Sequence, residues 1–218
     1  MRLPRFATPL LALLLLAATG ASAQVEVGVK LTDSGTTKWK TTHNGKKAEY
    51  LVGPYTAELT LDGEKVGGVE VFCVDFLHQV TRGQQWKAYA SLLNGSLTST
   101  LYGPAARTQY RQAAWLTTQY ATAPTTEWGN IQGTIWNLFT GSAPDPANSF
   151  WLDLATKNYK SIRTDRVAIL TDKKGMSGKG QEFVLTMPGS TVTPEPGTLL
   201  LMASGLLGVV GFGLRRLG

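Results

Sequence analysis

The chemistry that this sequence can offer centres on its only cysteine, Cys73, in the stretch EVFCVDFLH. A lone cysteine needs an explanation if the chain is exported, because it has no partner for an intramolecular disulfide. Val69, Val71 and Cys73 share one face of the predicted strand, and Phe72 shares the other with further apolar residues. A strand that is apolar on both faces is typical of a central, covered strand. We therefore expect Cys73 to point into protein.

A second polar group falls at a buried position of a predicted helix. At about 100° per residue, Ile131, Ile135 and Phe139 lie on one apolar arc, and Gln132 lies within it. A buried amide without partners costs about 1–3 kcal/mol, so Gln132 must either hydrogen-bond to the backbone or react. The reaction open to it is attack by a thiolate, which displaces ammonia and leaves a Cys73–Gln132 thioester. The opposite side of this helix is formed by Gly129, Asn130, Gly133, Thr134, Asn137 and Thr140.

Other uses of these residues compete with a thioester. In the first alternative both residues have a structural role: Cys73 is a buried, inert thiol and Gln132 is a core amide satisfied by hydrogen bonds. A cysteine hydrolase with His78 as base and Asp75 as its orienting group is disfavoured, because residues 73 and 78 face opposite ways on a strand. Two histidines and one cysteine make a metal site improbable. No nucleotide-binding motif appears, and we expect neither a cofactor nor a nucleic-acid partner.

Residues 1–23 have the features of a signal peptide. Arg2 and Arg5 precede an apolar stretch over residues 10–18 that is too short to span a bilayer. Small residues at 21–23 form a cleavage site just before Gln24. The chain is therefore predicted to be exported.

The C-terminal residues 194–218 combine three parts in a fixed order. Pro194-Glu195-Pro196 comes first, an uncharged run over residues 197–214 is long enough to span a membrane, and Arg215 and Arg216 follow. This arrangement resembles the PEP-CTERM sorting signal of Gram-negative bacteria. The resemblance implies anchoring in the inner membrane, recognition by an exosortase and release to the cell surface or the exopolysaccharide matrix. A permanent single-pass anchor is the alternative.

Residues 70–140 also resemble the thioester domains of bacterial surface adhesins. Those domains place an aromatic residue before the reactive cysteine, as Phe72 stands before Cys73, and carry a Gln-x-Ala-x-Trp signature on a helix. Here Gln132 and Trp136 match, while Thr134 replaces alanine. The resemblance implies that the cysteine is the acyl carrier and the glutamine the acyl donor, and that a surface amine attacks the thioester to form an amide. The supporting residues would be Phe72, Asp75, Trp128 and Trp136.

The body over residues 24–187 predicts one α+β domain, an antiparallel sheet or sandwich packed against two to three helices. Strands are expected at 25–32, 55–61 and 65–76, the last two joined at Asp62-Gly63. Helices are expected at 105–121, at 128–139 and from Asp145 to Tyr159. A closing strand pair is expected at 166–170 and 182–187, and residues 188–193 read as a spacer to the membrane.

Charge and aromatic content leave the binding partner open. Four of the 21 basic residues and one of the 15 acidic residues lie in the two terminal segments, so the formal charge falls from +6 for the chain to +3 for the body. The lysines at 38, 40, 46 and 47 could touch acidic polysaccharide but are more simply a solvated face. Trp39 and Trp86 are the tryptophans left for sugar stacking. We expect a non-enzymatic surface or matrix protein, either a covalent adhesin or a structural or carbohydrate-binding module.

Overall fold

The computed structural model describes residues 24–35, 37–146 and 149–191. The predicted signal peptide, the Pro194-Glu195-Pro196 motif, the span over 197–214 and the pair Arg215-Arg216 lie outside these residues. Within the described ranges, no helix has the length and apolar character needed to cross a membrane.

Six antiparallel strands close into a barrel in the order β1-β4-β5-β8-β7-β6. Closure follows from β1, which pairs with β4 along one edge and with β6 along the other. The expectation of an open sheet or a sandwich was therefore wrong, although the antiparallel pairing was right. The barrel strands are β1 (Val25–Asp33), β4 (Tyr55–Leu61), β5 (Glu64–Cys73), β6 (Gln85–Leu92), β7 (Val167–Asp172) and β8 (Phe183–Thr186).

The turn between β4 and β5 was predicted correctly. Asp62 and Gly63 have φ angles of 50° and 85°, and two successive positive φ angles are those of the tight turn that matches the twist of a hairpin. The second strand ends earlier than predicted, at Cys73 instead of residue 76.

The last three residues of β5 and the first three of β8 are buried on both faces, as predicted, whereas β5 is exposed or half-buried before Val71. Val71, Cys73 and Phe183 belong to the core inside the barrel. Phe72 and Val184 belong to a second core that lies between the barrel wall and the helices. Successive side chains of β5 and β8 point to opposite faces of the barrel wall and therefore pack in two separate cores.

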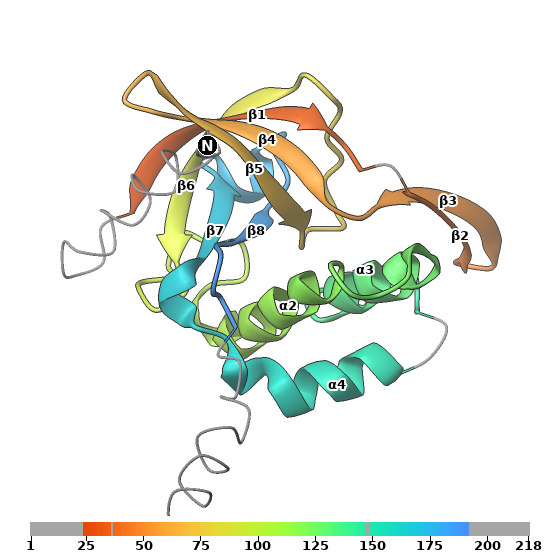
Figure 1. The fold of residues 1–218 in the computed structure, drawn as a ribbon. Coiled ribbons are helices and arrows are strands. Elements are labelled where there is room, and N and C mark those ends of the chain that lie inside the picture. Colours follow the sequence, from red (N-terminus) through yellow and green to blue (C-terminus); the bar gives the residue numbers. More distant parts are fainter. Residues whose placement is uncertain (1–23, 36, 147–148, 192–218) are drawn as a thin grey trace, which may run out of the picture.

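In the described part of the chain, three α-helices lie on one side of the barrel, with α2 and α3 between the barrel and α4 (Figure 1). They are α2 (Arg107–Gln119), α3 (Trp128–Asn137) and α4 (Phe150–Asn158), accompanied by the short 3₁₀ turns η1 (Pro104–Ala106), η2 (Thr125–Glu127), η3 (Tyr159–Ser161), η4 (Thr164–Arg166) and η5 (Gly175–Ser177). The first two helices match the sequence pattern. The third begins later than expected, because Ser149 and not Asp145 precedes its first residue.

A separate hairpin, β2 (Thr37–His43) and β3 (Lys46–Val52), extends from the barrel and reaches α3 (Figure 1). Its Trp39 ring lies against the backbone of α3 at Gly129 and Gly133, where a Cβ atom would come within 2.2 and 2.8 Å of the indole. This contact explains why the glycine side of α3 is buried, although the helical count had placed it opposite the apolar arc. Trp39 is therefore packed and not free to stack on a sugar.

Replacing Gly129 by alanine should detach Trp39 from α3 and destabilise the protein. We expect the free energy of unfolding to fall by about 1–3 kcal/mol, the usual cost of overpacking, as measured by urea unfolding. In a Trp39→Ala background the same change should no longer destabilise, because only the higher helix propensity of alanine remains. Equal losses in both backgrounds would contradict the proposed contact.

Candidate functional site

Cys73 is the last residue of β5 and has no exposed surface. Its thiol donates to the Asp75 carbonyl oxygen at 3.2 Å, and its sulfur accepts from the Trp136 indole nitrogen at 3.4 Å. Burial raises the pKa of the Cys73 thiol to about 12, although the Trp136 hydrogen bond opposes that rise. The sulfur is thus sealed from water and protonated at neutral pH.

Gln132 lies on the buried face of α3, as the helical count predicted, and is also fully buried. Its amide nitrogen donates to the Cys73 carbonyl oxygen at 2.8 Å. Its amide oxygen accepts from the Tyr120 hydroxyl at 3.1 Å. The structure therefore brings the Gln132 side chain into contact with the backbone of Cys73, 59 residues earlier in the sequence, and both residues are fully buried.

Tyr120 is the member of this group whose polar role the sequence did not reveal. It directly follows α2, and its ring packs against Phe72 at 5.2 Å and against Trp128 at 5.3 Å between centroids. The helical spacing had placed Tyr120 in the core, but only the packing of α2 on α3 aims its hydroxyl at Gln132. Phe72 and Trp128 thus hold Tyr120, while Trp136 contacts the sulfur directly.

Asp75 does not touch the glutamine. Its buried carboxylate accepts from the Leu77 backbone N–H at 2.9 Å and contacts His78 Nδ1 at 2.5 Å. Asp75 therefore shapes the turn after β5. The other ring nitrogen of His78 faces the Met176 carbonyl oxygen at 3.1 Å. Because both ring nitrogens of His78 are engaged away from the sulfur, no cysteine–histidine dyad forms. Although burial favours the neutral ring, the Asp75 carboxylate raises the pKa of His78.

A buried carboxylate at the start of β8 was missed by the sequence analysis. Glu182 has no exposed surface and accepts from the Leu101 backbone N–H at 2.8 Å. The hydroxyls of Tyr110 and Thr171 also donate to it, each at 2.5 Å. Burial raises the pKa of Glu182 to about 7, against the effect of these three hydrogen bonds. Nothing in the sequence distinguished this glutamate from an exposed one, because its donors come from three distant segments.

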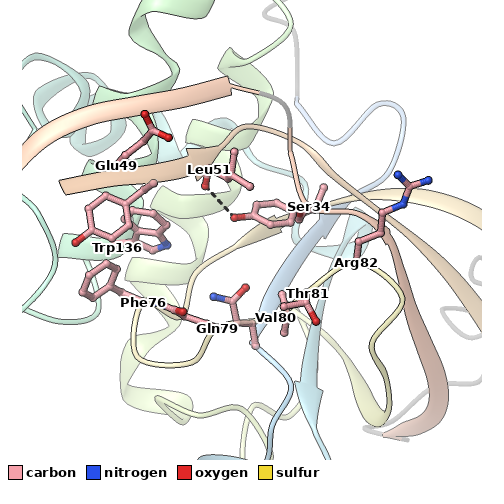
Figure 2. Close-up of a pocket in the computed structure, with 12 residues that line it drawn as sticks. Ser34, Glu49, Leu51, Phe76, Gln79, Val80, Thr81, Arg82 and Trp136 are labelled. Atoms are coloured by element: carbon pink, nitrogen blue, oxygen red, sulfur yellow. Dashed lines mark hydrogen bonds between the residues drawn. The ribbon is translucent and has the colours of Figure 1, made fainter.

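Trp136 also lines a cavity of about 320 Å³, which we call the aromatic cavity. Figure 2 shows Trp136 and Phe76 toward one end and Thr81 and Arg82 toward the other. Trp136 both lines this cavity and donates to the Cys73 sulfur. The lining residues are Ser34, Glu49, Tyr50, Leu51, Tyr55, Phe76, Gln79, Val80, Thr81, Arg82, Trp136 and Gln181.

Among the described residues, no group of three or more histidine, cysteine, aspartate or glutamate side chains could hold a metal ion. Trp86, the second tryptophan expected to be free for sugar, stacks on Phe183 at 6.1 Å between centroids. The Trp86 ring also lies close to Gly180, where a Cβ atom would come within 2.6 Å of the indole. Trp86 therefore packs on the barrel core, yet it is half-buried and lines a second cavity of about 490 Å³.

Comparison with protein families gives one match. The model of the PEP-CTERM protein-sorting motif matches residues 192–216. The chain carries a PEP-CTERM sorting motif. This motif implies export, sorting through the C-terminus at a membrane, and processing by exosortase, a membrane enzyme. No significant match was found among curated proteins or among solved structures. The resemblance to thioester adhesin domains gains no support from these comparisons and rests on its short motifs.

The raised pKa of Glu182 predicts a specific pH dependence of stability. Between about pH 4.5, the ordinary value, and about pH 7, the folded protein holds a proton on Glu182 that the unfolded chain has lost. Stability therefore falls as pH rises through this window, by an amount on the order of 3 kcal/mol. Urea unfolding at a series of pH values checks this. Glu182→Gln should flatten the profile between these values, and an unchanged slope in the variant would refute the assignment.

Proposed function

We propose that this PEP-CTERM protein is a non-enzymatic surface adhesin that attaches covalently through a thioester between Cys73 and Gln132. The observation that carries the proposal is the contact of the Gln132 amide nitrogen with the Cys73 backbone at 2.8 Å inside a fully buried space. A thioester needs its thiol and its carboxamide held in near contact. It also needs exclusion of water, because water would hydrolyse it.

The neighbouring groups suit the acyl transfer. The Cys73 sulfur would bond to the side-chain carbonyl carbon of Gln132, the bond from that carbon to nitrogen would break, and ammonia would leave with the thiol proton. The Tyr120 hydroxyl, which donates to the amide oxygen, would stabilise negative charge there during attack. The Trp136 N–H, which donates to sulfur, favours the thiolate over the thiol.

The attachment reaction would require the buried pair to open toward the target, because neither Cys73 nor Gln132 has exposed surface in this structure. An amine on a target surface would form a bond to the carbonyl carbon, and the carbon–sulfur bond would break. Cys73 would regain its proton and the amine would be left as an amide of residue 132. The acyl group is consumed once, so the protein acts as a single-use adhesive and not as a turnover catalyst.

A second candidate is a structural or carbohydrate-binding matrix module in which Cys73 is an inert thiol. It is favoured by the hydrogen bonds of the pair: both polar ends of the Gln132 amide have partners, and the thiol both donates and accepts. Burial, which raises the thiol pKa to about 12, also opposes nucleophilic attack. In this case exosortase sorting would deliver a protein that binds reversibly.

Intact mass distinguishes the two candidates. Freshly purified full chain should be lighter than its sequence by one ammonia, while Cys73→Ala and Gln132→Ala should show their full calculated masses. Methylamine should restore a free thiol and add its own mass. Tyr120→Phe should lower the fraction of ammonia-depleted protein if its hydroxyl assists the transfer. Full mass in the unmodified chain, with a thiol that alkylates once the protein is unfolded, would establish the inert cysteine.

Processing at the sorting motif is tested separately. We expect that, in a host with a matching exosortase, the body is cut from the segment over residues 197–214 near Pro194-Glu195-Pro196 and is released from the membrane. Replacing Glu195 by alanine should leave the uncut chain in the membrane fraction, as seen by immunoblot of fractionated cells. Equal release of the variant and the unmodified chain would favour a route independent of the motif.

A further inference from the structure

We propose that the aromatic cavity binds a neutral saccharide reversibly, whether or not the Cys73–Gln132 thioester forms. Its volume of about 320 Å³ falls within the range of small-molecule sites, about 300–1,000 Å³. Such sites combine apolar walls with a few oriented polar groups. Both features are present here, on residues that come from five separate parts of the chain.

The apolar wall is built from aromatic rings of β3 and of the segment after β5. Tyr50 and Phe76 are half-buried, so part of each ring remains accessible, and their centroids are 5.6 Å apart at 62°. Trp136 closes the wall behind them, at 5.9 Å from Tyr50 and 5.1 Å from Phe76. The carbon–hydrogen face of a sugar ring is the part of a saccharide that packs on such apolar ring faces.

The most specific polar group is Gln181, a lining residue that is 7% exposed. Its amide nitrogen donates to the carbonyl oxygens of Asp75 and His78. Two carbonyl oxygens cannot donate in return, so the orientation of the amide is fixed and its oxygen is an acceptor. That oxygen is buried and has no partner in the part of the chain that the structure describes. The oxygen itself exposes less than 1 Å², so a ligand hydroxyl would supply the missing donor only together with a small shift of the cavity wall.

The other polar groups favour a neutral ligand. Figure 2 shows Gln79, an exposed residue, with its amide between the aromatic end and the end at Thr81 and Arg82. Glu49 stands at the aromatic end, opposite Arg82, and is paired with Lys38 at 2.9 Å. Opposite charges at the two ends give no net attraction for a polyanion or for an ammonium ion. Amides and hydroxyls that both donate and accept suit the hydroxyl groups of a sugar.

Saccharide binding is separable from the cysteine chemistry. Trp136 lies between the aromatic cavity and the Cys73 sulfur, and Cys73 and Gln132 do not line the cavity. The Cys73→Ala variant should therefore retain saccharide binding. This expectation separates failure of the proposed site from failure of the proposed thioester.

The test titrates purified full chain with tetrasaccharides of β-1,4-linked glucose and of N-acetylglucosamine, with a trimer of galacturonic acid, and with n-hexylamine, while tryptophan fluorescence is followed. Saturable binding of a neutral tetrasaccharide is expected, at unchanged affinity in Cys73→Ala. Gln79→Ala and Tyr50→Ala should each weaken it by about tenfold, which corresponds to loss of one good contact. Tyr89→Ala, a change on β6 outside the cavity lining, is the matched control.

Each other outcome overturns the proposal. Binding of the galacturonate trimer or of hexylamine without a neutral sugar would assign the cavity to an anionic or a cationic ligand. Neutral saccharide binding that survives both Gln79→Ala and Tyr50→Ala would place the site elsewhere. Because Gln79 is exposed and its replacement should not disturb folding, a fold defect in Tyr50→Ala leaves the test intact. Absence of saturable binding to every probe would show that the cavity holds only water.

Discussion

The hydrogen bond from the Gln132 amide to the Cys73 carbonyl oxygen joins the helical layer to the barrel at the end of β5. Cys73 is the last residue of β5 and still pairs with Phe183 of β8, and its carbonyl oxygen accepts the hydrogen bond from α3. A buried carbonyl needs a donor, and the only polar side chain on the inner stripe of α3 supplies it. The position of α3, and through it of Tyr120 and Trp136, follows from this contact.

Polar groups at the end of β5 need partners within the protein, because a hydrophobic core lies on each side of the strand there. Cys73 faces the barrel interior and Phe72 faces the helices, so neither face offers water to a polar group. Glu182, which directly precedes β8, is equally buried, and this burial raises its pKa to about 7. The pair of Cys73 and Gln132 is therefore shielded from solvent on both sides of the strand.

Much of this arrangement could be predicted from the sequence. Alternation in β5 and its Asp62-Gly63 turn are local features, and so is the arc of α3 that buries Gln132. What could not be predicted depends on contacts between distant segments. Closure of the barrel requires β1 to pair with both β4 and β6, and the same alternation of β1 fits an open sheet. The burial of Gly129 requires Trp39, about 90 residues earlier. The donors to Glu182 likewise come from elements far apart in the chain.

The anchoring of Trp39 on the glycine face of α3 has a consequence for how this surface can vary. The hairpin of β2 and β3 pairs with no barrel strand. It is fixed to the body by side-chain contacts, chiefly Trp39 on α3 and Tyr50 against Phe76 and Trp136. Its outward side chains, the lysines at 38, 40, 46 and 47 among them, can therefore change without disturbing the ladder of the barrel. The exposed surface of this hairpin can thus change in sequence while the barrel keeps its structure. Because β3 also contributes Glu49 and Tyr50 to the aromatic cavity, variation in this hairpin would alter what the protein recognises while the buried pair stays as it is.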